Sequence, residues 1–329
     1  MGFENIKPTV PLLSGIALSL CFPLVFKDPY ILSLIIPGLI WSVSCMGWNV
    51  IVRTGQFSMG QAAFMAIGGY VSALLCICLN ISVWIAMLVG GLVSAFIAFL
   101  VGVVVLRLGG IYFAIVTLAF GEVIRVIAIN LTEITKGSYG LIPPAPTISL
   151  GSFTINFAVS KVPYYYLALL IVIISGLVFW RVDQSRLGRI YRSIASNSTL
   201  SEHLGMHLMK YRVMAFTIAG FFTGVAGALY GHYLFFVGPT LFALSESIMI
   251  LIMCTVGGIS SAVAGPILGA LVLSASGDYL STLLRGAKPL VFGALVVTIV
   301  FFYPGGVVEA MRSVWRKLIS HRTNESMKP

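Results

Sequence analysis

The sequence predicts an all-α polytopic membrane protein with about ten transmembrane helices, and three observations lead to that fold class. Hydrophobic residues make up 59% of the chain and charged residues only 9%. A soluble domain carries roughly a quarter charged residues, so these charges are too few to cover a water-exposed surface. The apolar runs are also continuous over about 20 residues, the length of a helix that crosses a bilayer, and they do not alternate as barrel strands do.

Apolar runs between charges and turns delimit ten expected spans. They cover residues 10–26, 31–52, 58–79, 82–106, 110–131, 163–180, 213–236, 244–257, 261–282 and 289–304. The first run is interpreted as a retained helix because it lacks a small-x-small cleavage site. The eighth run is short and precedes Gly257-Gly258, and glycines also interrupt the segment near Ser58. We therefore expect a broken or re-entrant element at both places, within a single membrane domain over residues 1–329.

The distribution of Lys and Arg predicts the orientation. With ten spans both termini lie on one side, which then holds fourteen Lys and Arg against five on the other. The positive-inside rule makes the first side cytoplasmic. A basic loop at about 181–212 is then cytoplasmic, and a loop rich in Pro and Gly at about 132–162 is extracytoplasmic. Because topology explains the net charge of +10, nucleic-acid binding is not indicated. Two halves of five spans would allow inverted repeats, although their similarity is weak.

The cytoplasmic loop carries the most specific signal. Thr199 with Glu202 three residues later predicts a capping box at the start of a short helix. Gly205 predicts its end, because glycine readily takes the left-handed conformation that terminates helices. A short helix flanked by arginines suits docking into a partner, and a solvated basic loop is the alternative interpretation. The residues singled out in this loop are Gly188, Arg189, Arg192, Asn197, Thr199, Glu202 and Gly205.

This loop resembles the EAA-type coupling loop of ABC permeases, in the form found in the LivM type of branched-chain amino acid permease. Further stretches resemble the same family: Thr54–Phe64 with Gly68-Gly69-Tyr70, Leu106–Ala114 with Thr117–Glu122, and Gly257–Ser261 with Gly265–Ala270. The resemblance runs in order from about residue 40 to 306. The chain departs from the family where acidic and paired alanine residues are usual, and there it has Ser196, Ser198, Leu200 and Ser201. It also has Gly109-Gly110 in place of Arg-Gly.

The resemblance implies a permease subunit of an ABC importer for leucine, isoleucine and valine in the bacterial cytoplasmic (inner) membrane. It implies four kinds of partner: a second homologous permease, two cytoplasmic ABC ATPases, an extracytoplasmic solute-binding protein and the lipid bilayer. The chain has no Gly-rich loop ending in Gly-Lys-Ser/Thr, so we expect neither enzyme activity nor a cofactor on it, with ATP and Mg bound by the ATPases.

Other functions stay open at this point. A permease of the same family for urea or short amides is the first alternative. An ion-coupled secondary transporter should show more intramembrane carboxylates than Glu122, Glu246 and Asp278, and a membrane enzyme should show a convergent acid, base or metal cluster. His203 and His207 are four apart, but Gly205 lies between them, so a metal site is not expected.

Several residues are candidates for the translocation pathway. Broken helices expose backbone polar groups that can bind a zwitterion. A charge at a helix centre costs about 2.5–3.5 kcal/mol on insertion, so it needs a partner or a cavity. Glu122 and Arg125 share one helical face, and a structural ion pair is the favoured interpretation, with lining of the pathway second. The candidates are Ser58, Gln61, Thr117, Glu122, Arg125 and Ser260.

Two smaller expectations concern packing. Gly220 and Gly224, and likewise Gly265 and Gly269, have the spacing that lets two membrane helices approach closely. We interpret both pairs as packing sites rather than as parts of a functional site. His232 is expected to be a buried, hydrogen-bonded residue.

Overall fold

The computed structural model describes residues 28–150, 153–157 and 159–283, together with the single residues Ser19, Pro23 and Gly293. The expected spans 10–26 and 289–304 and the two termini lie outside the described residues. The elements are α2 (Pro29–Val52), α3 (Gln61–Leu79), α4 (Val83–Val105), α5 (Gly110–Asn130), α6 (Thr132–Thr135), η1 (Gly137–Tyr139), β1 (Thr147–Leu150), β2 (Phe153–Asn156), α7 (Val162–Gln184), α8 (Arg186–Ser196), α9 (Ser198–His203), α10 (Leu208–Leu234), η2 (Pro239–Phe242), α11 (Leu244–Gly257) and α12 (Ala264–Leu283).

Long apolar helices dominate this part of the chain. Six of them, α2, α3, α4, α5, α7 and α10, are long and apolar enough to cross a membrane. These six correspond to six of the expected spans, and α10 begins five residues earlier than expected, at Leu208. The expected spans 244–257 and 261–282 are occupied by α11 and α12, and α11 has only 14 residues. The chain is therefore a multi-pass helical protein, with one short antiparallel hairpin of β1 and β2 that the sequence did not predict.

Helix α10 lies at the centre of the bundle and packs against α2, α3 and α4. Glycines on α10 make this packing close: a side chain at Gly220 would meet Ala98, and one at Gly224 would meet Ser94, both on α4. In the same way, a side chain at Gly269 on α12 would meet the backbone of Met253 on α11. Both glycine pairs thus serve helix packing, as predicted, because a missing Cβ lets two backbones approach.

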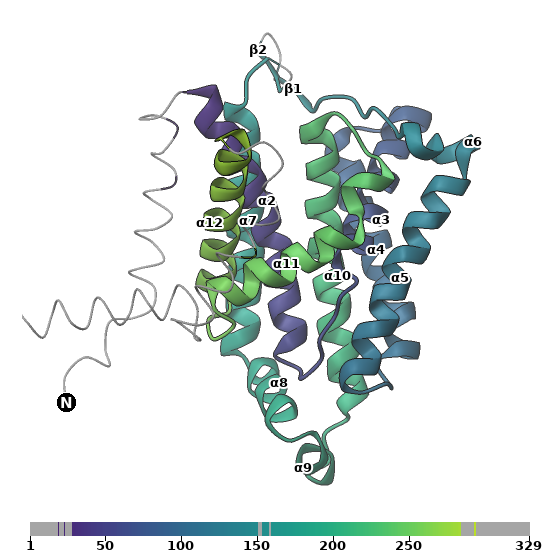
Figure 1. Ribbon diagram of the computed structural model, residues 1–329, viewed down its shortest axis with the longest axis vertical. Helices are drawn as coiled ribbons and strands as arrows, with labels where there is room; N and C mark the ends of the chain where they lie inside the picture. Colours follow the sequence, from purple (N-terminus) through teal and green to yellow (C-terminus); the bar gives the residue numbers. More distant parts are fainter. Residues whose placement is uncertain are drawn as a thin grey trace, which may run out of the picture.

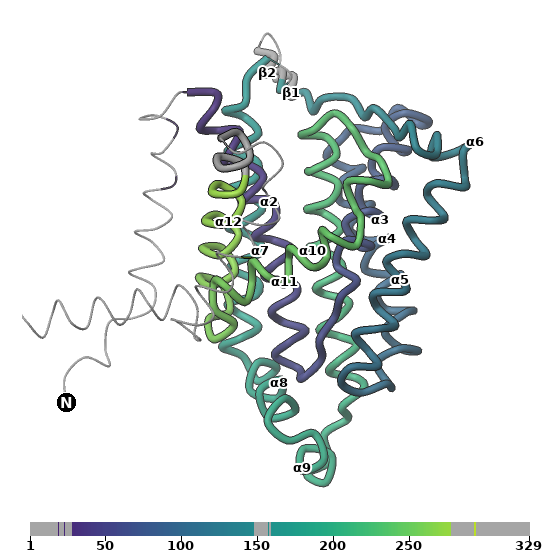
Figure 2. The backbone as a smooth tube through the Cα atoms, in the orientation of Figure 1, coloured from purple at the N-terminus to yellow at the C-terminus, as the bar shows by residue number. Residues whose placement is uncertain are grey.

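Two segments interrupt the pattern of long helices, at the places where glycines predicted a break. After α2 the chain is non-helical from Arg53 to Gly60 and runs back along the bundle before α3 begins at Gln61 (Figure 2). Helix α11 lies across the long helices at about the same level (Figure 1), and its C-cap Gly258 has a positive φ of 107°. The start of α3 and helix α11 are joined where the Ala62 amide donates to Ser247 Oγ (3.0 Å).

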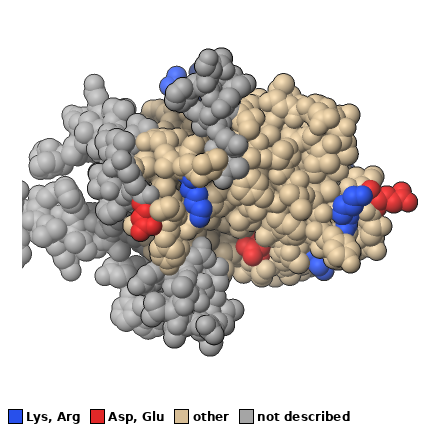
Figure 3. Space-filling view, turned by 90° about the horizontal axis from the view of Figure 1, so that it is seen from above, with Lys and Arg blue, Asp and Glu red and all other residues tan. Residues whose placement is uncertain are grey.

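The two connecting regions of the bundle lie at opposite ends. The hairpin and α6 are at one end, and α8 with α9 projects from the other (Figure 1). Seen from the hairpin end, the described surface is mostly uncharged, with a few scattered charged side chains (Figure 3). The α8–α9 end contains the basic loop at about 181–212. The two long loops therefore lie at opposite ends of the bundle.

Candidate functional site

Three of the candidate pathway residues meet at the junction between the non-helical segment and α3. Ser58 is 1% exposed, and its carbonyl accepts a hydrogen bond from Trp48 Nε1 on α2 (2.7 Å). The amide of the next residue, Met59, donates to Thr117 Oγ1 on α5 (2.9 Å). Thr117 is itself fully buried. The structure therefore brings Ser58 and Thr117 together through backbone and side-chain hydrogen bonds.

Gln61 is the third member of this junction and the first residue of α3. Its side chain is fully buried, and Oε1 accepts a hydrogen bond from Thr223 Oγ1 on α10 (3.1 Å). Its Nε2 has no hydrogen-bond partner among the described residues. Buried donors are almost always paired, so the unpaired Nε2 distinguishes Gln61 from the other polar residues of the junction.

Ser247 is a member of the junction that the sequence reasoning missed. It lies in the first turn of α11, is 3% exposed and accepts the hydrogen bond from the Ala62 amide. A hydroxyl at the start of the short eighth run was the available signal. Its partner is 185 residues away in the sequence, so the contact itself could not be predicted.

Ser260, in contrast, is placed elsewhere. It is exposed in the turn between α11 and α12, and its carbonyl accepts a hydrogen bond from Nη2 of Arg53 (2.8 Å). Arg53 follows the last residue of α2, at the α8 end of the bundle. Ser260 thus belongs to the environment of Arg53 and not to the junction around Gln61.

Glu122 and Arg125 form the predicted ion pair on α5. Arg125 Nε lies 3.0 Å from both carboxylate oxygens of Glu122, and Nη2 donates to Oε1 as well. The side chains are 42% and 32% exposed, on the outer face of α5. That face also exposes Ile111, Tyr112 and Val123. The structural pair is confirmed, and it faces outward from this chain rather than into its core.

Helix α8 is a second helix in the basic loop, for which the sequence predicts only one short helix. Ser185 caps it, since its Oγ accepts a hydrogen bond from the Leu187 amide (3.1 Å). Gly188, Tyr191 and Ile194 recur every three residues and are buried against the bundle. Arg189 and Arg192 occupy the outer side, where both residues are exposed. Burial raises the pKa of Tyr191 to about 12, so the phenol stays neutral.

Helix α9 is the short helix that was predicted, but its start was wrongly assigned. Asn197 is the N-cap, and its Oδ1 accepts a hydrogen bond from the Leu200 amide (2.9 Å). Thr199 therefore lies inside the helix, and the capping box with Glu202 does not form. Asparagine is at least as good an N-cap as threonine, and here it takes the position two residues earlier.

The end of α9 matches the prediction at Gly205, which has a φ of 82°. The Gly205 amide donates to the Glu202 carbonyl (2.9 Å), and the Met206 amide donates to the Ser201 carbonyl (3.1 Å). This pair of bonds is a Schellman motif, which fixes the end of a helix firmly. The capped helix exposes two leucines, Leu200 (56%) and Leu204 (67%), four residues apart.

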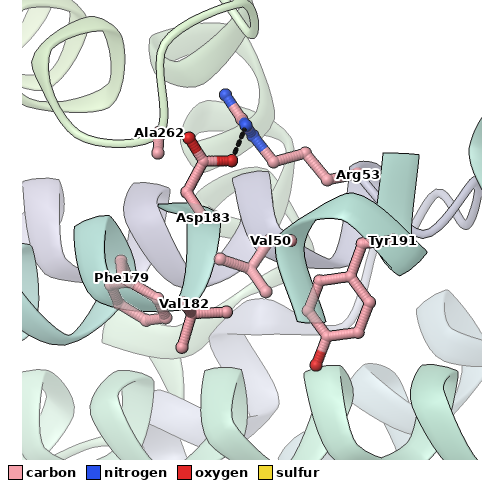
Figure 4. A pocket seen from close by; sticks show the side chains of 8 residues that line it. Val50, Arg53, Phe179, Val182, Asp183, Tyr191 and Ala262 are labelled. Atoms are coloured by element: carbon pink, nitrogen blue, oxygen red, sulfur yellow. Dashed lines mark hydrogen bonds and ion pairs between the residues drawn. The ribbon is translucent and has the colours of Figure 1, made fainter. Parts of the chain in front are cut away.

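A cluster of charged side chains connects α8 with the bundle. Asp183, in the last turn of α7, accepts from Nη1 of Arg53 (2.5 Å) and from Nη1 of Arg192 (2.6 Å). Burial lowers the pKa of Arg53, and the Asp183 carboxylate opposes that shift. Figure 4 shows Arg53 and Asp183 in a small pocket, which is lined by Val50, Arg53, Phe179, Val182, Asp183, Gly188, Tyr191 and Ala262.

His232 is the buried, hydrogen-bonded residue that was predicted. Its Nδ1 donates to the Pro144 carbonyl (2.9 Å), so its Nε2 accepts from the Ser72 hydroxyl (2.9 Å). It thereby ties the loop before β1 to α3 and α10. Within the described part of the chain, no three His, Cys, Asp or Glu side chains gather in a way that could hold a metal ion.

Comparisons with known proteins identify the family of the chain. Residues 30–301 match the model of a family described as "Branched-chain amino acid transport system / permease component". The chain belongs to this family of permease components. The permease is 33% identical over 294 residues to the "High-affinity branched-chain amino acid transport system permease protein LivM" of Salmonella typhimurium, which covers 83% of this chain and 69% of that protein.

A second relative gives the same result. The permease is 32% identical over 294 residues to the protein of the same name from Escherichia coli K12, with the same coverage of 83% and 69%. No solved structure matches the permease. Since the family match extends over every helix from α2 to α12, it includes the junction around Gln61, the ion pair on α5 and helices α8 and α9.

Proposed function

We propose that the permease is the membrane-spanning subunit of an ATP-driven importer that carries leucine, isoleucine and valine across the bacterial cytoplasmic (inner) membrane. The observation that carries this proposal is helix α9. It is capped at both ends, projects from the basic end of the bundle and exposes Leu200 and Leu204. A rigid helix with an apolar side is suited to lie in the groove of a partner. Two cytoplasmic ABC ATPases, which bind ATP and Mg, are the proposed partners at this helix.

The proposed topology has ten spans with both termini cytoplasmic. Helices α8 and α9 would then lie inside, and the hairpin of β1 and β2 would face the extracytoplasmic solute-binding protein. The opposite placement of these two regions in the bundle supports this arrangement (Figure 1). The bias of Lys and Arg toward the α8–α9 side supports the assignment of inside and outside.

The junction of Ser58, Gln61 and Thr117 is the proposed solute-binding part of the pathway. The free Nε2 of Gln61 is a donor without an acceptor, and the N-terminus of α3 begins at the same residue. Helix N-termini and amide donors suit the carboxylate of an amino acid. The junction is closed around these side chains in this conformation, so the solute would enter it when α3 and α11 separate. Ser260, exposed near Arg53, would line the inner end of the pathway.

The outer face of α5 is the proposed contact with the second, homologous permease. Helix α5 is the least buried of the six long helices, and its outer face carries the pair of Glu122 and Arg125. Helix α4 is also widely exposed, but its exposed side chains, such as Leu92 and Phe96, are apolar and suit lipid. An ion pair in a membrane is expected to face protein or water instead of lipid. The pair would therefore lie at the contact between the α5 helices of two permeases.

The experiment that tests this function uses the complete complex in proteoliposomes. We expect accumulation of radiolabelled leucine against its gradient that requires the ATPases, the binding protein and ATP, and that persists when ion gradients are collapsed. Accumulation by the permease alone, driven by an ion gradient, would contradict the proposal. Urea uptake, with no competition by leucine, isoleucine or valine, would contradict the assigned substrates and leave the ATP-driven mechanism in place.

A further inference from the structure

Asp183 holds together elements that lie far apart in the sequence. Its Oδ1 accepts from Arg53, 130 residues earlier, and from Arg192, nine residues later on α8. The Arg192 Nη2 adds a longer bond to the Asp183 backbone carbonyl (3.4 Å). The Asp183 side chain is only 15% exposed, whereas Arg192 is half exposed. One carboxylate thus joins the ends of α2 and α7 to helix α8.

Arg53 extends this connection to the interrupted helix. Its Nη2 donates to the carbonyls of Ile259 (3.2 Å) and Ser260 (2.8 Å), in the turn between α11 and α12. A guanidinium has donors in a fixed plane, so its orientation toward Asp183 also fixes its orientation toward the turn. Arg53 therefore links Asp183 to the turn that follows α11, the helix whose first turn carries Ser247 of the junction.

Helix α8 also touches the non-helical segment directly. Gly55 has a φ of 76°, and a Cβ placed on it would lie 3.2 Å from the Cα of Ala195, at the end of α8. With its amide oxygen turned toward Arg212 of α10, Gln56 accepts from Nε and Nη1 of that residue (3.2 Å each). Ser58 lies two residues further along the same segment, and Gln61 begins α3 directly after it.

We propose that Asp183 is the joint that transmits movement of α8 to both interrupted segments, the one from Arg53 to Gly60 and the turn after α11. It is a positioning residue for transport and does not contact the solute. Without the carboxylate, the guanidinium groups of Arg53 and Arg192 repel each other, because two like charges then lie close together with no negative charge between them. Helix α8 would separate from the end of α2, and the junction would no longer follow it. The inference rests on the proposed function, since a partner must move α8.

The test compares Asp183→Asn with the wild type in the complete complex, and measures leucine uptake and ATP hydrolysis in the same proteoliposomes. Asparagine keeps the size of the side chain and removes its charge. We expect uptake per ATP hydrolysed to fall at least tenfold, while ATP hydrolysis stays within twofold of the wild type. Asp183→Glu restores the charge and is expected to recover part of the uptake. Arg186→Gln, an exposed arginine at the start of α8, is the matched control and is expected to keep the wild-type ratio.

Several results would overturn the inference. Wild-type uptake per ATP in Asp183→Asn shows that the carboxylate transmits nothing. A parallel loss of uptake and hydrolysis shows that Asp183 supports assembly instead. If Asp183→Asn does not assemble, Arg192→Gln decides, because it leaves the bond between Arg53 and Asp183 intact and removes only the link to α8. If Arg192→Gln keeps uptake per ATP within twofold of the wild type, Asp183 does not transmit movement of α8.

A measurement on the permease alone separates this inference from the proposed function. Hydrogen exchange of the amides in the turn after Gly257 reports how firmly Arg53 holds it, whether or not ATP drives transport. We expect exchange there to be at least threefold faster in Asp183→Asn than in the wild type and unchanged in Arg186→Gln. If hydrogen exchange in this turn is the same in Asp183→Asn as in the wild type, Asp183 does not act as the joint between α8 and the turn. A wild-type complex that does not couple ATP to uptake refutes the proposed function instead.

Discussion

Replacement of Leu200 and Leu204 on α9 by serine should weaken binding of the ATPase strongly. Complete burial of a leucine side chain stabilises a contact by about 1.5–3 kcal/mol. Leu200 is 56% exposed and Leu204 is 67% exposed. For a partner that covers both, the stabilisation from each leucine is the energy of complete burial multiplied by its exposed fraction. The sum is about 2 to 4 kcal/mol, which corresponds to an increase of about 30- to 700-fold in the dissociation constant. The helix itself should persist, because Asn197 and Gly205 still cap it.

The assay for this prediction is binding of the purified ATPase to the permease in nanodiscs, by biolayer interferometry. The matched control is Leu131→Ser, which replaces a leucine of similar exposure (47%) at the opposite end of the bundle. The control should bind the ATPase as the wild type does. A double variant that binds within threefold of the wild type would show that α9 is a solvated loop helix and would refute the docking argument.

Three other variants test the junction, the ion pair and the packing. Gln61→Leu removes the free amide donor, and we expect leucine uptake to fall at least tenfold with the complex still assembled; uptake within twofold of the wild type would remove Gln61 from the pathway. Glu122→Gln leaves the charge of Arg125 unpaired in the membrane, which costs about 2.5–3.5 kcal/mol of insertion free energy. The yield of folded protein should therefore fall, and it should recover when Arg125→Gln is added. A recovered double variant without uptake would assign the pair to the pathway, and one with full uptake would assign it a structural role. Gly224→Ala should lower the free energy of unfolding by about 1–3 kcal/mol, because the new methyl group meets Ser94. Gly121→Ala is the control and should leave the free energy of unfolding unchanged, because no atom lies within 4 Å of the new methyl group.

Local patterns in the sequence predicted those features that depend on neighbours along the chain. Gly205 ends α9 because the left-handed conformation is needed there, and Glu122 pairs with Arg125 because residues three apart share a helical face. The N-cap of α9 was wrong for a local reason as well: Asn197 and Thr199 are both good caps, and the sequence does not show which one the packing of α8 favours. Helix α8 was missed because its three buried residues are separated by arginines, so the loop reads as uniformly basic.

Contacts between distant segments could not be predicted in this way. Asp183 is an isolated acid in a basic stretch, and its role appears only once Arg53 and Arg192 lie beside it. Ser247 becomes part of the junction because α11 crosses the bundle next to the start of α3. Ser260 lies outside the junction, because Arg53 binds the turn after α11 in which Ser260 is found.

The order of residues along the chain is enough to predict a bundle of membrane helices, the places where its helices break and which of its long loops is basic. These features follow from hydropathy, glycine and charge, because a bilayer requires each span to satisfy its own backbone hydrogen bonds. Only the packed helices show which broken segments meet, which face of α5 stays open and which carboxylate joins α8 to the bundle. Such contacts depend on the faces that helices present to each other, and those are fixed only when all the helices pack together.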